Sequence, residues 1–305
     1  MTINAIRTIC IAGPTASGKS SLALKLAANL NATIINADAL QVYDNWQVLT
    51  ARPSEDDLQR APHALYGHVD YRETYSVGAW LRDIAPLMAS DIPKIIVGGT
   101  GLYFSALTKG LAEIPAIPQS VRAAGDKIRA ESGAQGFHTY LQTYDPKLFA
   151  HMDQHNPMRL QRAWEVHQAT GRPLSSWQAD TPAPLLDPND AVRLVMQSDA
   201  TWLNARIDRR FDQMLEIGAL EECQRNIPDW DANRASSKAL GAPELIAMLR
   251  GELTRDQAIE RAKITTHQFA KRQRTWFRSK MGEWQHLTVA DLDDRNAISK
   301  ITSML

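Results

Sequence analysis

Several features that would assign a protein to a special class are scarce or missing in this chain of 305 residues. Its two cysteines, Cys10 and Cys223, lie far apart and form neither a disulfide framework nor a metal cluster. No basic segment followed by an apolar stretch opens the chain, and no run approaches the roughly 18 apolar residues of a membrane span. Lys+Arg and Asp+Glu both number 34, so no global charge attracts nucleic acid or membrane. We therefore expect a cytoplasmic protein without a membrane segment.

What the chain does contain is a phosphate-binding loop. The pattern G-x-x-x-x-G-K-[ST] is matched by Gly13, Pro14, Thr15, Ala16, Ser17, Gly18, Lys19 and Ser20. A β-branched apolar run at 6–12 precedes this loop, and leucines at helical spacing follow it. Backbone N–H groups and a helix N-terminus then bind an anion, while Lys19 reaches the terminal phosphate and the Ser20 hydroxyl binds Mg²⁺. A glycine turn that merely joins strand to helix is the disfavoured alternative.

The first part of the chain, residues 1–113, alternates strand and helix patterns. Strands are predicted at 33–36 and 94–97, and helices at 76–90 and 102–107. Strands separated by helices indicate an α/β fold, a P-loop NTPase-like parallel sheet with helices on both faces. Ligands of such sheets bind beyond the carboxyl ends of the strands.

A different pattern begins after Glu113, where two prolines interrupt the chain. Residues 114–190 show no strong strand, and helices are predicted at 119–131, 136–143, 146–151 and 157–169. Three prolines make 180–190 a linker; a strand at 191–196 then returns, and 200–280 is helical again. We therefore predict an α/β core made of 1–113 and 191–305, the latter with C-terminal helices, and a helical insertion domain at 114–190.

Two polar residues follow predicted strands. Asp38 ends the second strand, which we expect beside the P-loop strand, and a carboxylate there acts as general base or hydrogen-bond acceptor; a turn aspartate is the alternative. Thr100 follows the 94–97 strand, where its hydroxyl either donates to an oxyanion or caps a helix. That strand end carries no acid, which disfavours a motor-type ATPase and favours group transfer involving a small phosphate compound.

A basic stretch lies near the end of the chain. Residues 261–280 contain seven Lys or Arg, one His and no Asp or Glu. On a helix, Lys263, His267, Lys271, Arg274 and Arg278 fall within roughly 80° of arc. In a neutral protein this basic stripe indicates contact with a nucleic-acid backbone, and a solvated face paired with acids from elsewhere is the alternative. Further basic residues that reach a phosphate or pair with surface acids are Arg159, Arg162, Arg206, Arg209 and Arg210.

Taken together, these motifs resemble the tRNA dimethylallyltransferase family, the adenosine-37 isopentenyl transferases, over nearly the whole chain. A P-loop alone is shared by very many proteins, whereas the ordered set is specific to the family. The set comprises residues 13–20, Asp38 through Tyr43, 50–54, Pro62-His63, Tyr75-Ser76, 98–104, Arg159-Leu160, Arg162-Ala163, Glu165-Val166, Thr170-Gly171, 206–212, Met214-Leu215, 270–273 and 275–278.

The resemblance implies transfer of a dimethylallyl group from its diphosphate to N6 of adenosine 37 in tRNAs that read codons beginning with U. Residues 13–20 would hold the diphosphate, with Lys19 neutralising it and Mg²⁺ on Ser20. Thr100 and Arg210 would bind leaving-group oxygens, and Asp38 would accept the N6 proton of a flipped adenine. The anticodon stem-loop would contact Asp38, Ala39, Leu40, Gln41, Thr100, Arg122, Met158, Arg159, Leu160, Gln161, Arg162, Lys271, Arg274 and Arg278.

The sequence departs from the family pattern at a few positions. Ala39 stands in place of the usual serine, Leu49 in place of a glycine and Met158 in place of a glutamine. In 238–243, Ala242 and Pro243 follow Gly241, where the family usually has an aromatic and a basic residue. Two other functions stay open: a P-loop kinase of small molecules or nucleotides, and a non-catalytic RNA-binding module. Nothing indicates an obligate oligomer, so we expect a monomer.

Overall fold

The structure is a computed structural model that describes residues 8–288 and 297–303. One sheet of six parallel strands has the order β3-β2-β4-β1-β5-β6. This confirms the predicted parallel α/β fold; Ile6 and Arg7, included in the predicted first strand, lie outside the described residues. The strands are β1 Thr8–Ala12, β2 Thr33–Asn36, β3 His63–Ala64, β4 Lys94–Gly98, β5 Ala191–Met196 and β6 Gln285–Leu287.

The order of the strands corrects one expectation. β4 lies between β1 and β2, so that Ile95 pairs with Ile9 on one side and with Ile34 on the other. The strand that leads to Asp38 is therefore not the neighbour of the P-loop strand. Short apolar runs identify buried strands but do not specify their order, which depends on contacts between distant segments. All three strands are parallel, so their carboxyl ends still meet at one edge of the sheet.

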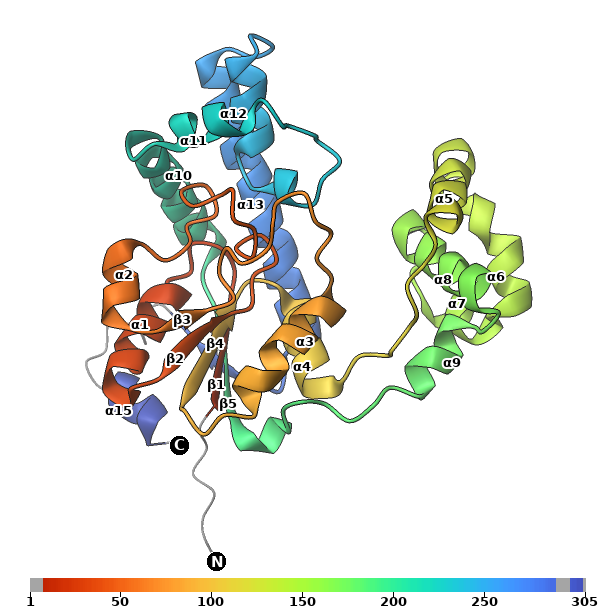
Figure 1. The fold of residues 1–305 in the computed structure, drawn as a ribbon, viewed down its shortest axis with the longest axis horizontal. Helices are drawn as coiled ribbons and strands as arrows, with labels where there is room; N and C mark the ends of the chain where they lie inside the picture. The colour runs from red at the N-terminus through yellow and green to blue at the C-terminus, as the bar shows by residue number, and fades with distance from the viewer. Residues whose placement is uncertain (1–7, 289–296, 304–305) are drawn as a thin grey trace, which may run out of the picture. The chain divides into compact units, whose positions relative to one another are not determined.

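Helices cover both faces of this sheet (Figure 1). On one face, Leu22 and Leu26 of α1 pack against strand residues such as Ile9 and Ile34. On the other face, Trp80 of α3 and the aromatic residues of α4 pack with Phe277, near the end of α13. Burial on both faces explains why the strands read as continuous apolar runs rather than alternating ones.

The helices of this part of the chain surround the sheet and extend beyond it. A separate apolar cluster joins α10, α11 and α12 to the buried Trp46 and Leu49 of the segment after β2. None of the helices in the described ranges is long and apolar enough to cross a bilayer. The helices are α1 Lys19–Leu30, α2 Glu55–Arg60, α3 Val77–Met88, α4 Gly101–Lys109, α10 Ala200–Glu216, α11 Ala219–Asn226, α12 Ala242–Leu249, α13 Arg255–Lys280 and α15 Ala297–Thr302, with 3₁₀ turns Pro188–Asp190 and Ser236–Lys238.

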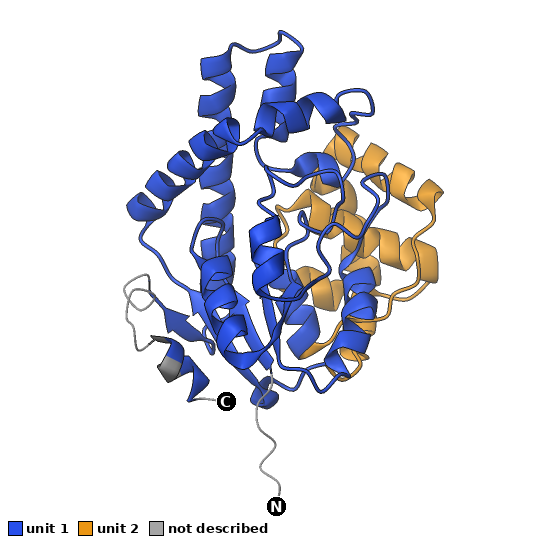
Figure 2. Ribbon diagram, turned by 60° about the vertical axis from the view of Figure 1, so that its left-hand side comes forward, with its two compact units in different colours: residues 1–108, 185–305 blue, residues 109–184 orange. Residues whose placement is uncertain are grey.

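The chain divides into two compact units, one made of 1–108 and 185–305 and the other of 109–184 (Figure 2). The second unit is helical and has its own core around Phe137, Leu141 and Leu160. The sequence analysis placed the helical insertion at 114–190, and the compact unit spans 109–184. Its helices are α5 Gln119–Ser132, α6 His138–Tyr144, α7 Pro146–His151, α8 Pro157–Thr170 and α9 Leu174–Ala179, with a 3₁₀ turn Gln135–Phe137.

Candidate active site

The P-loop connects β1 to α1 in a conformation suited to an anion. Ala16 and Gly18 adopt left-handed backbone angles, with φ of 61° and 91°, which turn the chain tightly at the N-terminus of α1. No side chain caps that helix end. The Ser17 hydroxyl oxygen is buried and has no hydrogen-bond partner among the described residues. An uncapped helix N-terminus beside a buried, unpaired hydroxyl is the environment that a phosphate group satisfies.

Two cations and one carboxylate meet at this loop. The Lys19 Nζ donates to the Pro14 carbonyl oxygen at 3.2 Å. Burial lowers the pKa of Lys19 to about 8, with Asp38 opposing the shift and Arg210 adding to it. Burial likewise lowers the pKa of Arg210, and Asp38 opposes that shift. The positive charges of Lys19 and Arg210 are thus poorly hydrated and close to each other, so a bound anion stabilises both.

Asp38 is held by a fully buried asparagine. The Asn36 Oδ1 accepts from the Asp38 backbone N–H at 2.8 Å, and its Nδ2 donates to the Asp38 carbonyl at 3.0 Å and to that of Leu65 at 2.9 Å. The Asp38 Oδ1 accepts from the Leu40 N–H at 3.0 Å. Its Oδ2 accepts no hydrogen bond from any residue that the structure describes. One carboxylate oxygen is therefore fixed and the other is free to accept a proton.

The Thr100 hydroxyl does not cap the following helix, which was one of the two roles that the sequence left open. Its Oγ1 accepts from the Ala39 backbone N–H at 2.9 Å. The first turn of α4 is closed by its backbone carbonyl instead, which accepts from the Tyr103 N–H at 3.0 Å. Because the oxygen is already an acceptor from Ala39, the hydroxyl hydrogen is available to donate to a ligand.

A small cavity adjoins these polar groups. Its polar lining comes from Asp38, Arg210 and three threonines, Thr15, Thr50 and Thr266. The remaining lining residues are mostly apolar side chains, contributed by α10, α13 and the loops after β2 and before α12. These apolar residues are Leu40, Leu49, Ile207, Phe211, Met214, Leu240 and Phe269. A phosphate cradle next to an apolar wall fits a ligand with an anionic end and a hydrocarbon end.

A residue that the sequence analysis named only as part of the 270–273 motif joins the two glycine-containing loops. Gln273 of α13 is buried; its Oε1 accepts from the Thr15 N–H and its Nε2 donates to the Gly99 carbonyl, both at 2.9 Å. A Cβ at Gly99 would lie 2.3 Å from that Nε2, and one at Gly101 would lie 2.1 Å from the ring of Trp276. Two signals were available: its place in the 270–273 motif, and a polar residue on the same side of the helix as Phe269 and Trp276.

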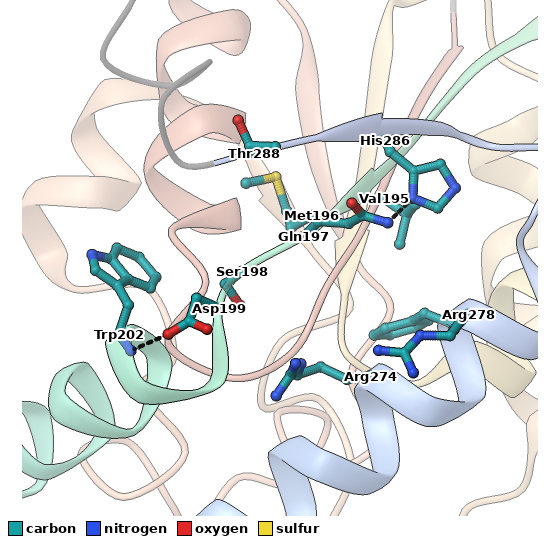
Figure 3. Close-up of a pocket in the computed structure, with 11 residues that line it drawn as sticks. Val195, Met196, Gln197, Ser198, Asp199, Trp202, Arg274, Arg278, His286 and Thr288 are labelled. Atoms are coloured by element: carbon teal, nitrogen blue, oxygen red, sulfur yellow. Dashed lines mark hydrogen bonds between the residues drawn. The ribbon is translucent and has the colours of Figure 1, made fainter.

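The basic stripe of α13 divides into two parts. Lys263 forms an ion pair with Asp212 at 2.7 Å, and His267 is hydrogen-bonded to Asp208 at 2.8 Å, so this part follows the alternative of pairing with acids. Lys271 and Arg278 are exposed and Arg274 is half-buried. Figure 3 shows Arg274 and Arg278 beside a cavity of about 550 Å³ at the ends of β5 and β6, which Asp199, Trp202 and His286 also line.

In the second unit, the predicted RNA-contact residues differ in exposure. Arg122, Met158, Arg159 and Arg162 are exposed. Leu160 is fully buried in the core of the unit, and Gln161 is buried while donating to Asp126 and Glu165. The side chains of Leu160 and Gln161 thus face the interior of the unit, so any contact of these two residues with RNA would use their backbone groups.

The predicted contact residues after β2 lie near Asp38 and are half-buried: Ala39, Leu40 and Gln41. The Gln41 side chain donates to the carbonyls of Thr50 and Ala51, each at 2.9 Å. Its amide hydrogens are thus committed to holding this loop. The backbone N–H groups of Ala39 and Leu40 are likewise committed, to the Thr100 Oγ1 and the Asp38 Oδ1.

Among the described residues of the P-loop, Ser20 is the one that could bind Mg²⁺. The described residues contain no group of three or more His, Cys, Asp or Glu residues that could hold a metal ion. The Ser20 hydroxyl, at the start of α1, is exposed. Ser20 is thus a single protein ligand, and Mg²⁺ at this loop would take its other ligands from phosphate oxygens and water, which is how this ion binds in phosphate-transferring sites.

Comparison with known proteins gives one consistent result. Residues 41–280 match the family described as IPP transferase, and 6–66 that described as isopentenyl transferase. A tRNA dimethylallyltransferase of Dinoroseobacter shibae is 55% identical over 283 residues, covering 93% of this chain and 95% of the relative. One of a Ruegeria species is 52% identical over 286 residues, covering 94% and 97%.

Solved structures agree with this assignment. The tRNA isopentenylpyrophosphate transferase of Bacillus halodurans is 29% identical with a TM-score of 0.69, covering 98% of this chain and 95% of that one. A eukaryotic dimethylallyltransferase acting on tRNA is 25% identical with a TM-score of 0.80, covering 98% and 78%. The matching family, the identity over more than nine tenths of the chain and the shared fold together show that this chain belongs to the tRNA dimethylallyltransferase family.

Proposed function

We propose that this prenyl transferase moves a dimethylallyl group from dimethylallyl diphosphate to N6 of adenosine 37, in tRNAs that read codons beginning with U, and releases diphosphate. One observation carries the proposal: Lys19, Arg210, Thr100 and Asp38 converge on an anion cradle that adjoins an apolar-walled cavity. The cradle suits the diphosphate, the apolar wall suits the prenyl chain, and Asp38 lies between them and the entering base.

The donor binds through its leaving group. The amides of 13–20 and the Ser17 hydroxyl hold the diphosphate, and Lys19 and Arg210 neutralise it. Thr100 donates its free hydroxyl hydrogen to a leaving-group oxygen. Each interaction strengthens as negative charge develops on the diphosphate, so the site stabilises the transition state more than the bound donor. Mg²⁺ on Ser20 would add further positive charge at the same oxygens.

The reaction forms the N6–C1 bond, breaks the C1–O bond and moves one proton from N6. The N6 lone pair attacks C1 of the dimethylallyl group, and the C1–O bond breaks with its electron pair moving to the diphosphate. The nitrogen becomes positively charged and loses one proton to the Asp38 Oδ2. This oxygen accepts no hydrogen bond from the described residues, whereas Oδ1 accepts from Leu40. This proton transfer matters because the lone pair of an exocyclic amine is delocalised into the ring and is a weak nucleophile. Asn36 keeps the carboxylate in place during the step.

The tRNA reaches this site by its anticodon stem-loop. Adenosine 37 leaves the base stack, as enzymes that modify a base require. Arg122, Arg159 and Arg162 of the second unit and Lys271, Arg274 and Arg278 of α13 contact its phosphates, so the helical unit serves to grip the anticodon arm. Because tRNA is the substrate, we place the reaction in the cytoplasm, with the protein acting as a monomer.

A P-loop kinase is the second candidate function. The P-loop and a carboxylate after β2 suit a kinase too, but the apolar wall beside Asp38 does not suit a polar phosphoryl acceptor. A non-catalytic RNA-binding module would have no use for a carboxylate with one oxygen fixed and one free. Both alternatives predict no prenyl transfer.

The deciding assay incubates the protein with labelled dimethylallyl diphosphate, Mg²⁺ and unmodified tRNA. We expect label in adenosine 37, found by nuclease digestion and chromatography, and none in a matched tRNA with guanosine at position 37. Phosphate transfer from ATP to a small acceptor, with no label in the tRNA, would establish the kinase. Tight tRNA binding without either reaction would establish the binding module.

A further inference from the structure

Gln273, near the end of the chain, connects two loops that both come from its first third. Its side-chain oxygen accepts from Thr15 in the P-loop, 258 residues away, and its side-chain nitrogen donates to Gly99, which precedes Thr100. At the strand ends themselves, the Gly13 N–H donates to the Gly98 carbonyl at 3.2 Å. Beyond that point the two loops leave the sheet, and the Gln273 amide bridges them.

The amide is matched to the two groups that it contacts. The Thr15 N–H needs an acceptor and the Gly99 carbonyl needs a donor, so the orientation of the amide is fixed by its partners. A carboxylate cannot donate, an ammonium cannot accept, and a thioether does neither well. The bridge thus requires a neutral group with one acceptor and one donor at its tip.

The bridge requires a glycine at position 99, where Gln273 contacts the second loop. A Cβ at Gly99 would lie 2.3 Å from the Gln273 Nε2 and 3.1 Å from the Asp38 Oδ2. Gln273 and the free oxygen of Asp38 therefore lie close to the same glycine. One turn further along α13, Trp276 packs against Gly101 in the same manner, so α13 supports the residues on both sides of Thr100.

We infer that Gln273 is a positioning residue, one that keeps the diphosphate-binding loop in register with Thr100 and Asp38. It does so without touching the substrate: it fixes the Thr15 peptide at the start of the loop and the Gly99 peptide before Thr100. This inference rests on the proposed function of the site. Loss of the bridge lets the two loops separate, which weakens the grip on the diphosphate and the contact from Thr100 while leaving the exposed basic residues of α13 unchanged.

The test compares Q273M, Q273E and a control, Q268M, which changes an exposed glutamine of the same helix. We expect Q273M to keep the tRNA affinity of the wild type, to bind inorganic diphosphate with Mg²⁺ at least tenfold more weakly, and to lose kcat as well as raise the donor KM. Q268M should match the wild type in all four. A Q273M with diphosphate affinity and kcat within twofold of Q268M would overturn the inference.

Q273E supplies a second measurement with a pH signature. An ionised glutamate still accepts from Thr15, but it faces the Gly99 carbonyl without a donor and adds negative charge beside the diphosphate. A protonated glutamate offers one acceptor and one O–H donor, as glutamine does. The diphosphate affinity of Q273E relative to the wild type, compared at each pH, should therefore recover as the pH falls. A ratio that stays constant with pH contradicts the bridge, even if Q273M fails to fold.

The outcome is separable from that of the proposed function. Labelling of adenosine 37 is measured with the wild type, whereas diphosphate binding is measured by calorimetry without tRNA. If the wild type labels no tRNA, the proposed function fails while the comparison of diphosphate affinities still decides the role of Gln273. If the wild type labels tRNA and the variants bind diphosphate normally, the inference about Gln273 alone is wrong.

Discussion

The hydroxyl oxygen of Thr100 accepts a hydrogen bond from the backbone N–H of Ala39, 2.9 Å away. This contact links the end of β4 to the residue that follows Asp38. Because the oxygen accepts in this bond, the hydroxyl hydrogen stays available to donate to another group. This bond thus holds Thr100 close to Asp38, the two residues to which we assign the donor to the leaving group and the proton acceptor.

Replacing Thr100 by valine should remove that donor while keeping the shape of the side chain. We expect kcat to fall by about 10²-fold, because a donor that acts on developing charge contributes at this level. T100S keeps the hydroxyl and should retain most of the activity. Single-turnover labelling of tRNA measures the effect, and equal rates for T100V and T100S would contradict the assigned role.

Replacing Asp38 by asparagine tests the proton acceptor. The side-chain carbonyl of the new amide can still accept from the Leu40 N–H, so the loop should be preserved, but no carboxylate remains to take the N6 proton. We expect a loss of about 10²–10⁴-fold in the rate of transfer, the usual contribution of a general base. The tRNA affinity, measured by filter binding, should change by less than about twofold. A parallel loss of affinity would instead assign Asp38 to recognition.

The lowered pKa of Lys19 predicts a pH dependence for donor binding. Its ammonium is charged below a pKa of about 8 and neutral above it in the free enzyme. The donor KM should therefore be flat below about pH 8 and rise by up to about tenfold per pH unit above it. K19R stays charged throughout and should lack this rise, which separates the effect from ionisation of the donor.

The same shift predicts an effect on stability. The pKa of Lys19 is lower in the folded state than the ordinary value of 10.5, so between about pH 8 and 10.5 the unfolded chain binds more protons. The contribution of Lys19 to stability therefore rises with pH in that window and is unfavourable below it. K19M should melt at a higher temperature than the wild type at pH 7 while binding no diphosphate. A lower melting temperature would show that Lys19 supports the fold.

Glu222 of α11 stabilises the loop that carries Leu49 and Thr50. Its buried carboxylate accepts from the backbone N–H groups of Gln47, Val48 and Leu49. E222Q replaces one acceptor oxygen by a donor that faces these N–H groups, so we expect a loss of about 2–3 kcal/mol in the free energy of unfolding. Urea denaturation measures it, with E221Q as the exposed control. Equal stabilities of the two variants would mean that the loop is held by its apolar contacts alone.

The exposed basic residues of α13 predict a strong salt dependence of tRNA binding. Neutralising Lys271 or Arg278 should weaken binding and reduce the slope of log Kd against log salt by about one each. K263Q is the matched control, because Lys263 is already paired with Asp212. If K263Q and K271Q lower the slope equally, RNA binding displaces the ion pairs between α10 and α13.

Motifs confined to short segments were predictable from the sequence. The P-loop, Asp38 and Thr100 each follow a strand whose apolar run is visible, and a parallel sheet brings such strand ends to one edge. In the structure Lys19 and Arg210 interact with Asp38, and Thr100 is hydrogen-bonded to the residue after Asp38. The catalytic roles of these four residues are our proposal.

Contacts between distant segments were not predictable in the same way. β4 lies between β1 and β2, although all three strands have similar apolar sequences. Asp208 and Asp212 are four residues apart on α10, as Lys263 and His267 are on α13, and only the packing of the two helices pairs them. Leu160 and Gln161 lie beside exposed arginines, yet neighbouring helices bury them.

By itself the sequence determined the family, the parallel α/β fold and the P-loop, because the P-loop is one contiguous segment with glycines and a lysine at fixed spacing. The tertiary structure decided which side chains support that cradle. Gln273 reaches Thr15 across 258 residues, and Asn36 grips both backbone groups of Asp38. A hydrogen bond depends on distance and direction in space, and these arise only once the sheet and α13 have packed together.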